Sequence, residues 1–87
     1  MRIEVEYEKT FLKILDKLPS KVEDKFYNRL ELFLQNPIHP LLRNHSVDPA
    51  YPGCRSINVT VDYRAIFKQK GNTITFLYIG THSQLYG

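Results

Sequence analysis

The sequence predicts an α+β fold in which a helical hairpin packs on one face of an antiparallel β-sheet. Three observations support this prediction. Apolar residues alternate with charged ones near the N-terminus, then recur at helical spacing between residues 9 and 36. Apolar and polar residues alternate again after residue 55, and Gly71-Asn72 further along gives a clear hairpin signal. A chain of 87 residues can bury one modest core, so we expect a single domain over residues 1–87.

The first half of the chain predicts one strand and two helices. Residues 3–7 alternate apolar and charged side chains, which is typical of a half-buried strand. Residues 9–18 then place apolar side chains on one side of a helix, and a proline ends it. Ser20 and Glu23 have capping-box spacing, so a second helix is expected from Ser20 to about residue 36. The short break between these helices predicts an antiparallel hairpin.

The second half predicts a loop followed by three strands. Residues 36–53 contain four prolines, and we interpret them as a surface loop long enough to be suspected of function. Three strands are expected after it, with a tight turn near Val61-Asp62: residues 56–62, 63–68 and 73–79. The tail after Gly80 is long enough for one helical turn. The predicted order is therefore β-α-α-β-β-β.

Composition narrows the class of protein. Residues 1–36 carry seven basic and seven acidic residues, whereas residues 37–87 hold the whole net charge of +3 and all three histidines. The apolar runs are far shorter than the roughly 20 residues that cross a bilayer, and we expect no membrane partner. The single cysteine, Cys54, fits a reducing compartment, so a soluble cytoplasmic protein is expected.

Several kinds of site are not supported by the spacing of residues. His39 and His45 lie six positions apart in the loop and Cys54 stands alone, which is not a zinc-ligand pattern. The glycines are scattered singly, so no phosphate-binding loop is expected, and no Gly-x-Ser-x-Gly elbow occurs. We therefore expect neither a metal nor a cofactor.

The remaining polar residues suit metal-independent cleavage of RNA. In that reaction a ribose 2′-hydroxyl loses a proton as it attacks phosphorus, and the leaving 5′-oxygen gains one. Histidine titrates near neutrality, arginine can counter the charge on the phosphate oxygens, and an aromatic ring can stack on a base. The chain has all of these groups in its second half: His45, Arg55, Asp62, Tyr63, Arg64 and His82.

Three segments carry a resemblance to a known family. Residues 53–55 (Gly-Cys-Arg), 62–67 (Asp-Tyr-Arg-Ala-Ile-Phe) and 78–87 (Tyr-Ile-Gly-Thr-His-Ser-Gln-Leu-Tyr-Gly) resemble the RelE/ParE superfamily of bacterial toxins. The YafQ-like mRNA interferases are the most similar branch. The resemblance implies a RelE-like fold and the toxin of a type II toxin–antitoxin system. It also implies cleavage of mRNA in the ribosomal A site and inhibition by a cognate antitoxin.

The resemblance also implies roles for individual residues. His82 and His45 match the histidines that transfer protons, and Asp62 matches an acidic residue that orients or transfers a proton. Arg64 matches the arginine that counters the phosphate charge. Residues expected to contact RNA are Arg55, Tyr63, Asn58 and Lys68. Asn58 stands where the YafQ-like pattern has a further histidine, and an amide cannot transfer a proton near neutral pH.

Other interpretations remain open at this point. His82 and His45 could be ordinary tail and loop histidines, and Arg64 could pair with a carboxylate. Asp62 suits a turn, Tyr63 suits sheet packing, and Arg55 could support the strand surface. Two other functions compete with the nuclease: a ParE-like inhibitor of DNA gyrase, and a degenerate toxin that only binds its antitoxin.

Overall fold

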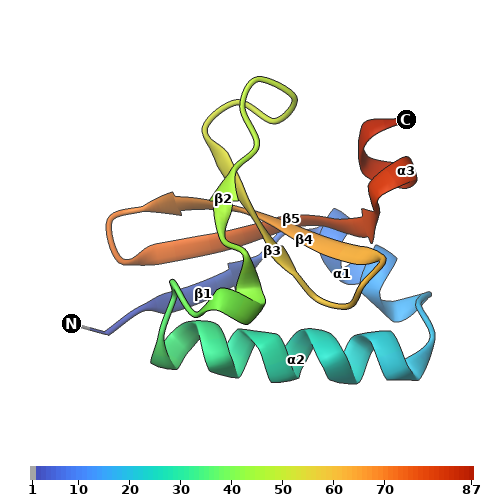
Figure 1. Cartoon of the computed structure of the whole chain (residues 1–87), viewed down its shortest axis with the longest axis horizontal. Coiled ribbons are helices and arrows are strands. Elements are labelled where there is room, and N and C mark those ends of the chain that lie inside the picture. The colour runs from blue at the N-terminus through green and yellow to red at the C-terminus, as the bar shows by residue number, and fades with distance from the viewer. Residues whose placement is uncertain (1) are drawn as a thin grey trace.

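The computed structural model describes residues 2–87 and contains a five-stranded sheet with the order β1-β5-β4-β3-β2 (Figure 1). The elements are β1 (Glu4–Tyr7), α1 (Lys9–Asp16), α2 (Ser20–Gln35), the 3-10 turn η1 (Pro40–Leu42), β2 (His45–Ser46), β3 (Cys54–Asn58), β4 (Tyr63–Lys70), β5 (Thr73–Thr81) and α3 (His82–Tyr86). The α+β class and the RelE-like fold are confirmed, including the helical turn after Gly80. The predicted order lacks β2, which lies with η1 in the segment predicted to be a loop.

The sheet is mixed, so the prediction of a purely antiparallel sheet was wrong. Strands β2 to β5 pair antiparallel, but β1 pairs with β5 in parallel, with Val5 opposite Ile74. The alternating pattern of β1 fixes which side chains face the core, but it carries no information on strand direction.

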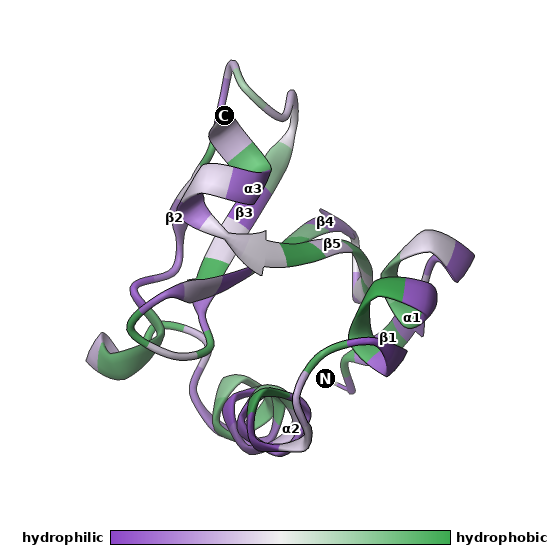
Figure 2. Ribbon diagram, turned by 90° about the vertical axis from the view of Figure 1, so that its right-hand side faces the viewer, coloured by the Kyte–Doolittle hydropathy of each residue, from purple (hydrophilic) through white to green (hydrophobic). Residues whose placement is uncertain are grey.

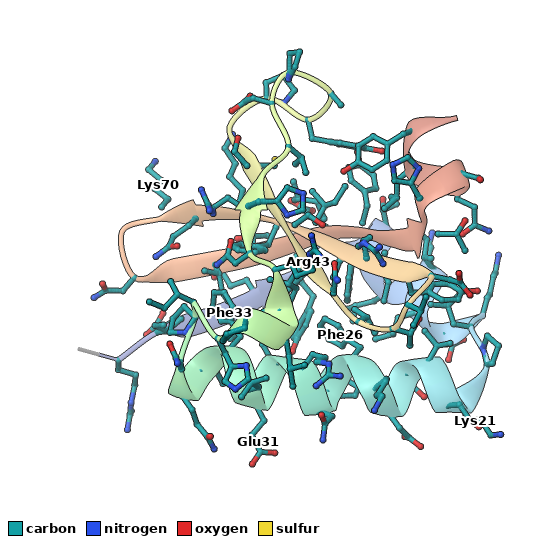
Figure 3. All side chains as sticks on the ribbon, in the orientation of Figure 1. Lys21, Phe26, Glu31, Phe33, Arg43 and Lys70 are labelled. Atoms are coloured by element: carbon teal, nitrogen blue, oxygen red, sulfur yellow. The ribbon has the colours of Figure 1, made fainter. Side chains whose placement is uncertain are left out.

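The main core lies between the sheet and helices α1 and α2. Figure 3 shows Phe26 and Phe33 pointing from α2 toward the sheet, whereas Lys21 and Glu31 point away from it. Phe26 is fully buried, and its ring lies 5.0 Å from the ring of Phe76 on β5 in an edge-to-face arrangement. Edge-to-face pairs of this kind add to the free energy of burial. Among residues 2–87, no helix combines the length and apolar character needed to cross a membrane.

A smaller core lies on the opposite face of the sheet. It consists of Val47, Cys54 and Ile66, with Tyr51 and Leu85 packed at its edge. Figure 2 shows α1 and α2 on one side of β4 and β5, and α3 on the other side. Helix α3 and the loop between β2 and β3 therefore shape this second face.

Two local predictions were wrong in detail. The expected capping box at Ser20 is absent because Pro19 is the N-cap residue and Ser20 already belongs to the helix. The strand expected over residues 56–62 runs from Cys54 to Asn58, and the chain turns earlier than predicted. The hydroxyl oxygen of Thr60 accepts hydrogen bonds from the amides of Asp62 (3.2 Å) and Tyr63 (3.0 Å). These bonds stabilise the turn, which then leads directly into β4.

Candidate active site

A cleft opens where the end of β5 meets the turn between β3 and β4. It has a volume of about 450 Å³ and is lined by Val61, Asp62, Tyr63, Arg64, Thr81, His82 and Ser83. We call it the His82 cleft. The structure thus brings together four residues singled out in the sequence, two of them charged and one an imidazole. They come from segments about 20 residues apart, which only the pairing of β4 with β5 places side by side.

Arg64, which lines this cleft, is held in place by the main chain. Its Nη1 donates hydrogen bonds to the carbonyl oxygens of Thr60 (3.1 Å), Val61 (2.9 Å) and Tyr63 (3.2 Å). These carbonyls are neutral, so the bonds fix the side chain without cancelling its charge. All three use Nη1 alone, and the remaining donors of the guanidinium fork are suited to bind an anion.

His82 is positioned by the way α3 begins. The Thr81 hydroxyl accepts from the Gln84 amide (3.2 Å), and the Gln84 side chain accepts from the Thr81 amide (2.9 Å). This capping box starts the helix directly after β5 and makes His82 its first residue. A Cβ on Gly80 would lie only 3.1 Å from Gln84 Oε1. The glycine therefore lets α3 fold back closely against β5.

Tyr86 packs against His82 within α3. Its ring lies 4.8 Å from the imidazole of His82, which precedes it by one turn of the helix. Burial raises the pKa of Tyr86, Tyr51 raises it further, and the positive charge of Arg64 acts in the opposite direction. The guanidinium and the imidazole both line the His82 cleft.

Asp62 and Tyr63 line the cleft in different ways. Asp62 is an exposed residue of the turn, so its carboxylate is accessible to a bound ligand. Tyr63 is half-buried and packs against the helix-side core as well as lining the cleft. Part of the Tyr63 ring is therefore buried against the core, as expected if this residue contributes to sheet packing.

His45 lies on the same sheet face but outside the His82 cleft. It stands on the edge strand β2 opposite Ser56, which is in turn opposite Ile66 on β4. Its Nδ1 is 2.6 Å from the carbonyl oxygen of Arg43, a residue in the left-handed region with φ 47°. A carbonyl only accepts, so Nδ1 carries the proton and the Nε2 of the neutral ring is an acceptor.

Three predicted RNA contacts are spread over the sheet. Asn58 is the cross-strand partner of Arg64, so these two side chains share a face. Lys68 stands opposite Cys54, nearer the β4–β5 hairpin and away from the cleft. Arg55 stands opposite Phe67 and therefore belongs to the other face; its Nε donates to Asn44 Oδ1 at 2.7 Å. Arg55 thus supports the loop and is not brought to the cleft.

The structure also reveals neighbours of the site that the sequence analysis missed. Tyr51 packs against Tyr86 of α3, and Ser56 is buried with a hydroxyl that has no hydrogen-bond partner within residues 2–87. A sequence signal existed only for the capping box, since Thr81 and Gln84 have the required spacing. The other contacts join residues that are far apart in the chain.

Comparison with known proteins identifies the family. Residues 5–86 match the family model described as ParE toxin of type II toxin-antitoxin system, parDE. The fold is similar to YafQ from E. coli strain BL21(DE3), with 22% identity and a TM-score of 0.82 over 99% of this chain and 100% of that one. An E. coli DinJ-YafQ complex gives 25% identity and a TM-score of 0.78 over 99% and 100% of the two chains.

The intact E. coli RelBE toxin-antitoxin complex is similar at 18% identity and a TM-score of 0.70, over 91% of this chain and 95% of that one. No curated protein sequence matches this chain closely enough to show a relationship. The family model covers nearly the whole chain, and the resemblance to the RelE/ParE superfamily is confirmed. The chain therefore belongs to the ParE toxin family, and it is a type II toxin of the RelE/ParE superfamily.

Proposed function

We propose that this toxin is a metal-independent endoribonuclease that cuts mRNA on the ribosome and so blocks translation. The observation that carries the proposal is the convergence of His82, Arg64 and Asp62 on one cleft. Toxins of the RelE, YafQ and YoeB types are generally endoribonucleases, which supports the same conclusion. A scissile phosphate in the His82 cleft meets a fixed cation and an imidazole together.

The reaction proposed is attack of a ribose 2′-oxygen on the adjacent phosphorus. The new bond is 2′-O–P, the bond that breaks is P–O5′, and the products are a 2′,3′-cyclic phosphate and a 5′-hydroxyl. Negative charge grows on the phosphate oxygens in the transition state. Arg64, already fixed through Nη1, is able to stabilise this charge without first reorganising.

Two protons have to move during this step. His82 and His45 are the proposed proton-transfer groups, with Asp62 orienting the reacting groups. His45 is suited to take a proton, because its Arg43 contact leaves Nε2 as the acceptor of the neutral ring. For both histidines to act on one phosphodiester, the scissile phosphate has to lie between β2 and α3 on this face of the sheet. Asn58, beside Arg64, contributes hydrogen bonds to phosphate in this proposal.

The direct test compares His82→Ala with His39→Asn. The control removes an imidazole from the loop, where His39 Nδ1 accepts from the Leu41 amide, and asparagine is also a good acceptor at this N-cap position. We expect His82→Ala to lower message cleavage by about 10²- to 10⁴-fold, as for loss of a general acid or base. Primer extension on translated messages and growth after induction measure the effect. Equal toxicity of His82→Ala and the unsubstituted toxin would remove His82 from the mechanism.

A second candidate is inhibition of DNA gyrase by binding. Two observations favour it: the matching family model is that of ParE toxins, and Asn58 replaces a histidine of the YafQ-like pattern. Such a toxin leaves no codon-linked breaks in messages but changes the supercoiling of plasmid DNA. Measuring message breaks and plasmid supercoiling in the same induced cells separates the two functions. If both stay unchanged, the toxin is non-catalytic.

The proposed partners are a cognate antitoxin and the translating ribosome in the cytoplasm. The E. coli DinJ-YafQ and RelBE structures are toxin–antitoxin complexes, which supports an antitoxin for this chain. The ribosome is proposed because a domain of net charge +3 has few groups with which to bind free RNA. We expect cleavage of a message in a translating extract and none of the same naked RNA.

A further inference from the structure

Tyr51 joins the loop between β2 and β3 to the C-terminal helix. Its phenol donates a hydrogen bond to the carbonyl oxygen of Leu85, 34 residues further along the chain, at 2.5 Å. Its ring lies 5.5 Å from that of Tyr78 on β5 and 5.7 Å from that of Tyr86 on α3. A tyrosine phenol is protonated at neutral pH, and burial and the neighbouring Tyr78 raise the pKa of Tyr51 further, so it remains a donor.

The loop holds Tyr51 firmly from its own side. The carboxylate of Asp48 accepts from the Gly53 amide at 2.8 Å, which closes the loop across its base. The Tyr51 amide donates to the Val47 carbonyl and the Tyr51 carbonyl accepts from the Cys54 amide, each at 3.0 Å. Val47 and Cys54 are buried against Ile66 of the sheet. The phenol therefore projects from a fixed support.

Besides the packing of Leu85 and Tyr86, the far end of helix α3 is held to the rest of the protein by the Tyr51 hydroxyl. It has five residues, far fewer than an isolated helix needs to be stable in water, and each keeps part of its surface exposed. The capping box fixes the first turn at Thr81 and Gln84. At the other end, the Gly87 amide donates to Ser83 within the tail itself, whereas the Leu85 carbonyl is bonded to Tyr51.

We propose that Tyr51 is a positioning residue of the toxin: its hydroxyl latches α3 onto the β2–β3 loop and so holds His82 over the cleft. The same loop follows directly from β2, which carries His45. Tyr51 therefore also fixes the segment bearing one histidine relative to the segment bearing the other. The claim that the Tyr51 hydroxyl orders α3 is independent of the reaction. The claim that this order matters for cleavage rests on the nuclease function proposed above.

The test compares Tyr51→Phe with Tyr78→Phe. Each variant removes one phenol oxygen from the same aromatic cluster, but only Tyr51→Phe removes the bond to Leu85. We expect the amide order parameters of residues 82–87 in Tyr51→Phe to fall from about 0.85 toward 0.6, with β5 unchanged. Cleavage on translating ribosomes should lose about 10- to 100-fold in kcat with KM within about twofold, because small misplacements of a reacting group are costly. Tyr78→Phe should match the unsubstituted toxin in both measurements.

The possible results separate this inference from the proposed function. Unchanged order parameters in Tyr51→Phe would overturn the latch, whatever the activity. Lower order parameters with unchanged kcat would overturn the positioning role of Tyr51. Lower order parameters in a toxin that cuts no message even when unsubstituted would support the latch and overturn the nuclease function. An equal loss of kcat in both variants would assign the effect to the aromatic cluster and overturn the role of the hydroxyl.

Discussion

The two faces of the sheet differ in what they bury. The helix-covered face is closed over aromatic side chains, and Phe11, Phe26, Phe67 and Phe76 have no exposed surface. The opposite face buries a core of only three residues and leaves a polar cleft beside it, with Arg64 and His82 among its lining residues. Most of the apolar burial that stabilises the fold is therefore on one side of the sheet, and the proposed chemistry is on the other.

The polar face also contains features that do not favour stability. The Ser56 hydroxyl is buried without a partner within residues 2–87, and such a group destabilises a fold by about 1–3 kcal/mol. Arg43 adopts a left-handed conformation that is uncommon for residues other than glycine. Both residues adjoin His45, as its cross-strand partner and its hydrogen-bond acceptor. Substitutions on the two faces should therefore change different properties.

The largest effect on stability should come from Phe26→Ala on the helix-covered face. Loss of a fully buried phenylalanine lowers the free energy of unfolding by about 3–5 kcal/mol, because it leaves a cavity. Leu34→Ala is the matched control on the same helix, since Leu34 is 44% exposed, and we expect a loss below about 1 kcal/mol. Urea unfolding measures both. A similar loss for the two variants would show that this face does not hold the main core.

Apart from His82→Ala, the largest effect on activity should come from Arg64→Gln on the polar face. Removing a group that stabilises developing negative charge lowers cleavage by about 10²- to 10³-fold. Lys70→Gln is the control, because it removes a cation from the same strand at the hairpin end (Figure 3). We expect near-normal cleavage from that variant in the translation extract. Equal activity of Arg64→Gln and Lys70→Gln would contradict the role of the guanidinium.

Gly80→Ala should have an intermediate effect on both properties. The added methyl group lies 3.1 Å from Gln84 Oε1 and 3.3 Å from Gln84 Cβ, so α3 has to shift. We expect a loss of about 1 kcal/mol in stability from overpacking and about tenfold in cleavage. Gly71→Ala, at φ 61° in the distant hairpin, should also lose about 1 kcal/mol but keep its cleavage activity. If both glycine variants kept full activity, the placement of α3 would not matter for the reaction.

The smallest effect should be a gain of stability from Ser56→Ala. The substitution removes a buried hydroxyl that has no partner, so unfolding should require about 1 kcal/mol more free energy. Ser46→Ala on the neighbouring strand should have the opposite sign, because the Ser46 hydroxyl bonds the Asp48 side chain and amide. Thermal unfolding of both variants gives the comparison. A loss of stability in Ser56→Ala would mean that its hydroxyl has a partner in solution.

The sequence predicted those features that depend on neighbouring residues. Both long helices, the Gly71 hairpin and the terminal helical turn follow from periodicity and turn residues, and the structure confirms them. The pairing of β1 with β5 was not predicted, because almost 70 residues separate Val5 from Ile74. Candidate residues such as Arg64 and His82 could be chosen by chemistry and resemblance. Their side-by-side placement required the register of β4 against β5.

By itself, then, the sequence determined the two longer helices, the Gly71 hairpin, the apolar faces and the family, because periodicity and short motifs are properties of consecutive residues. The tertiary structure decided strand direction, the assignment of Arg55 to the face opposite Arg64, and the bond from Tyr51 to Leu85. These depend on which distant segments meet when the chain closes. Contacts of this kind are set by the packing of the whole core, and no local pattern records them.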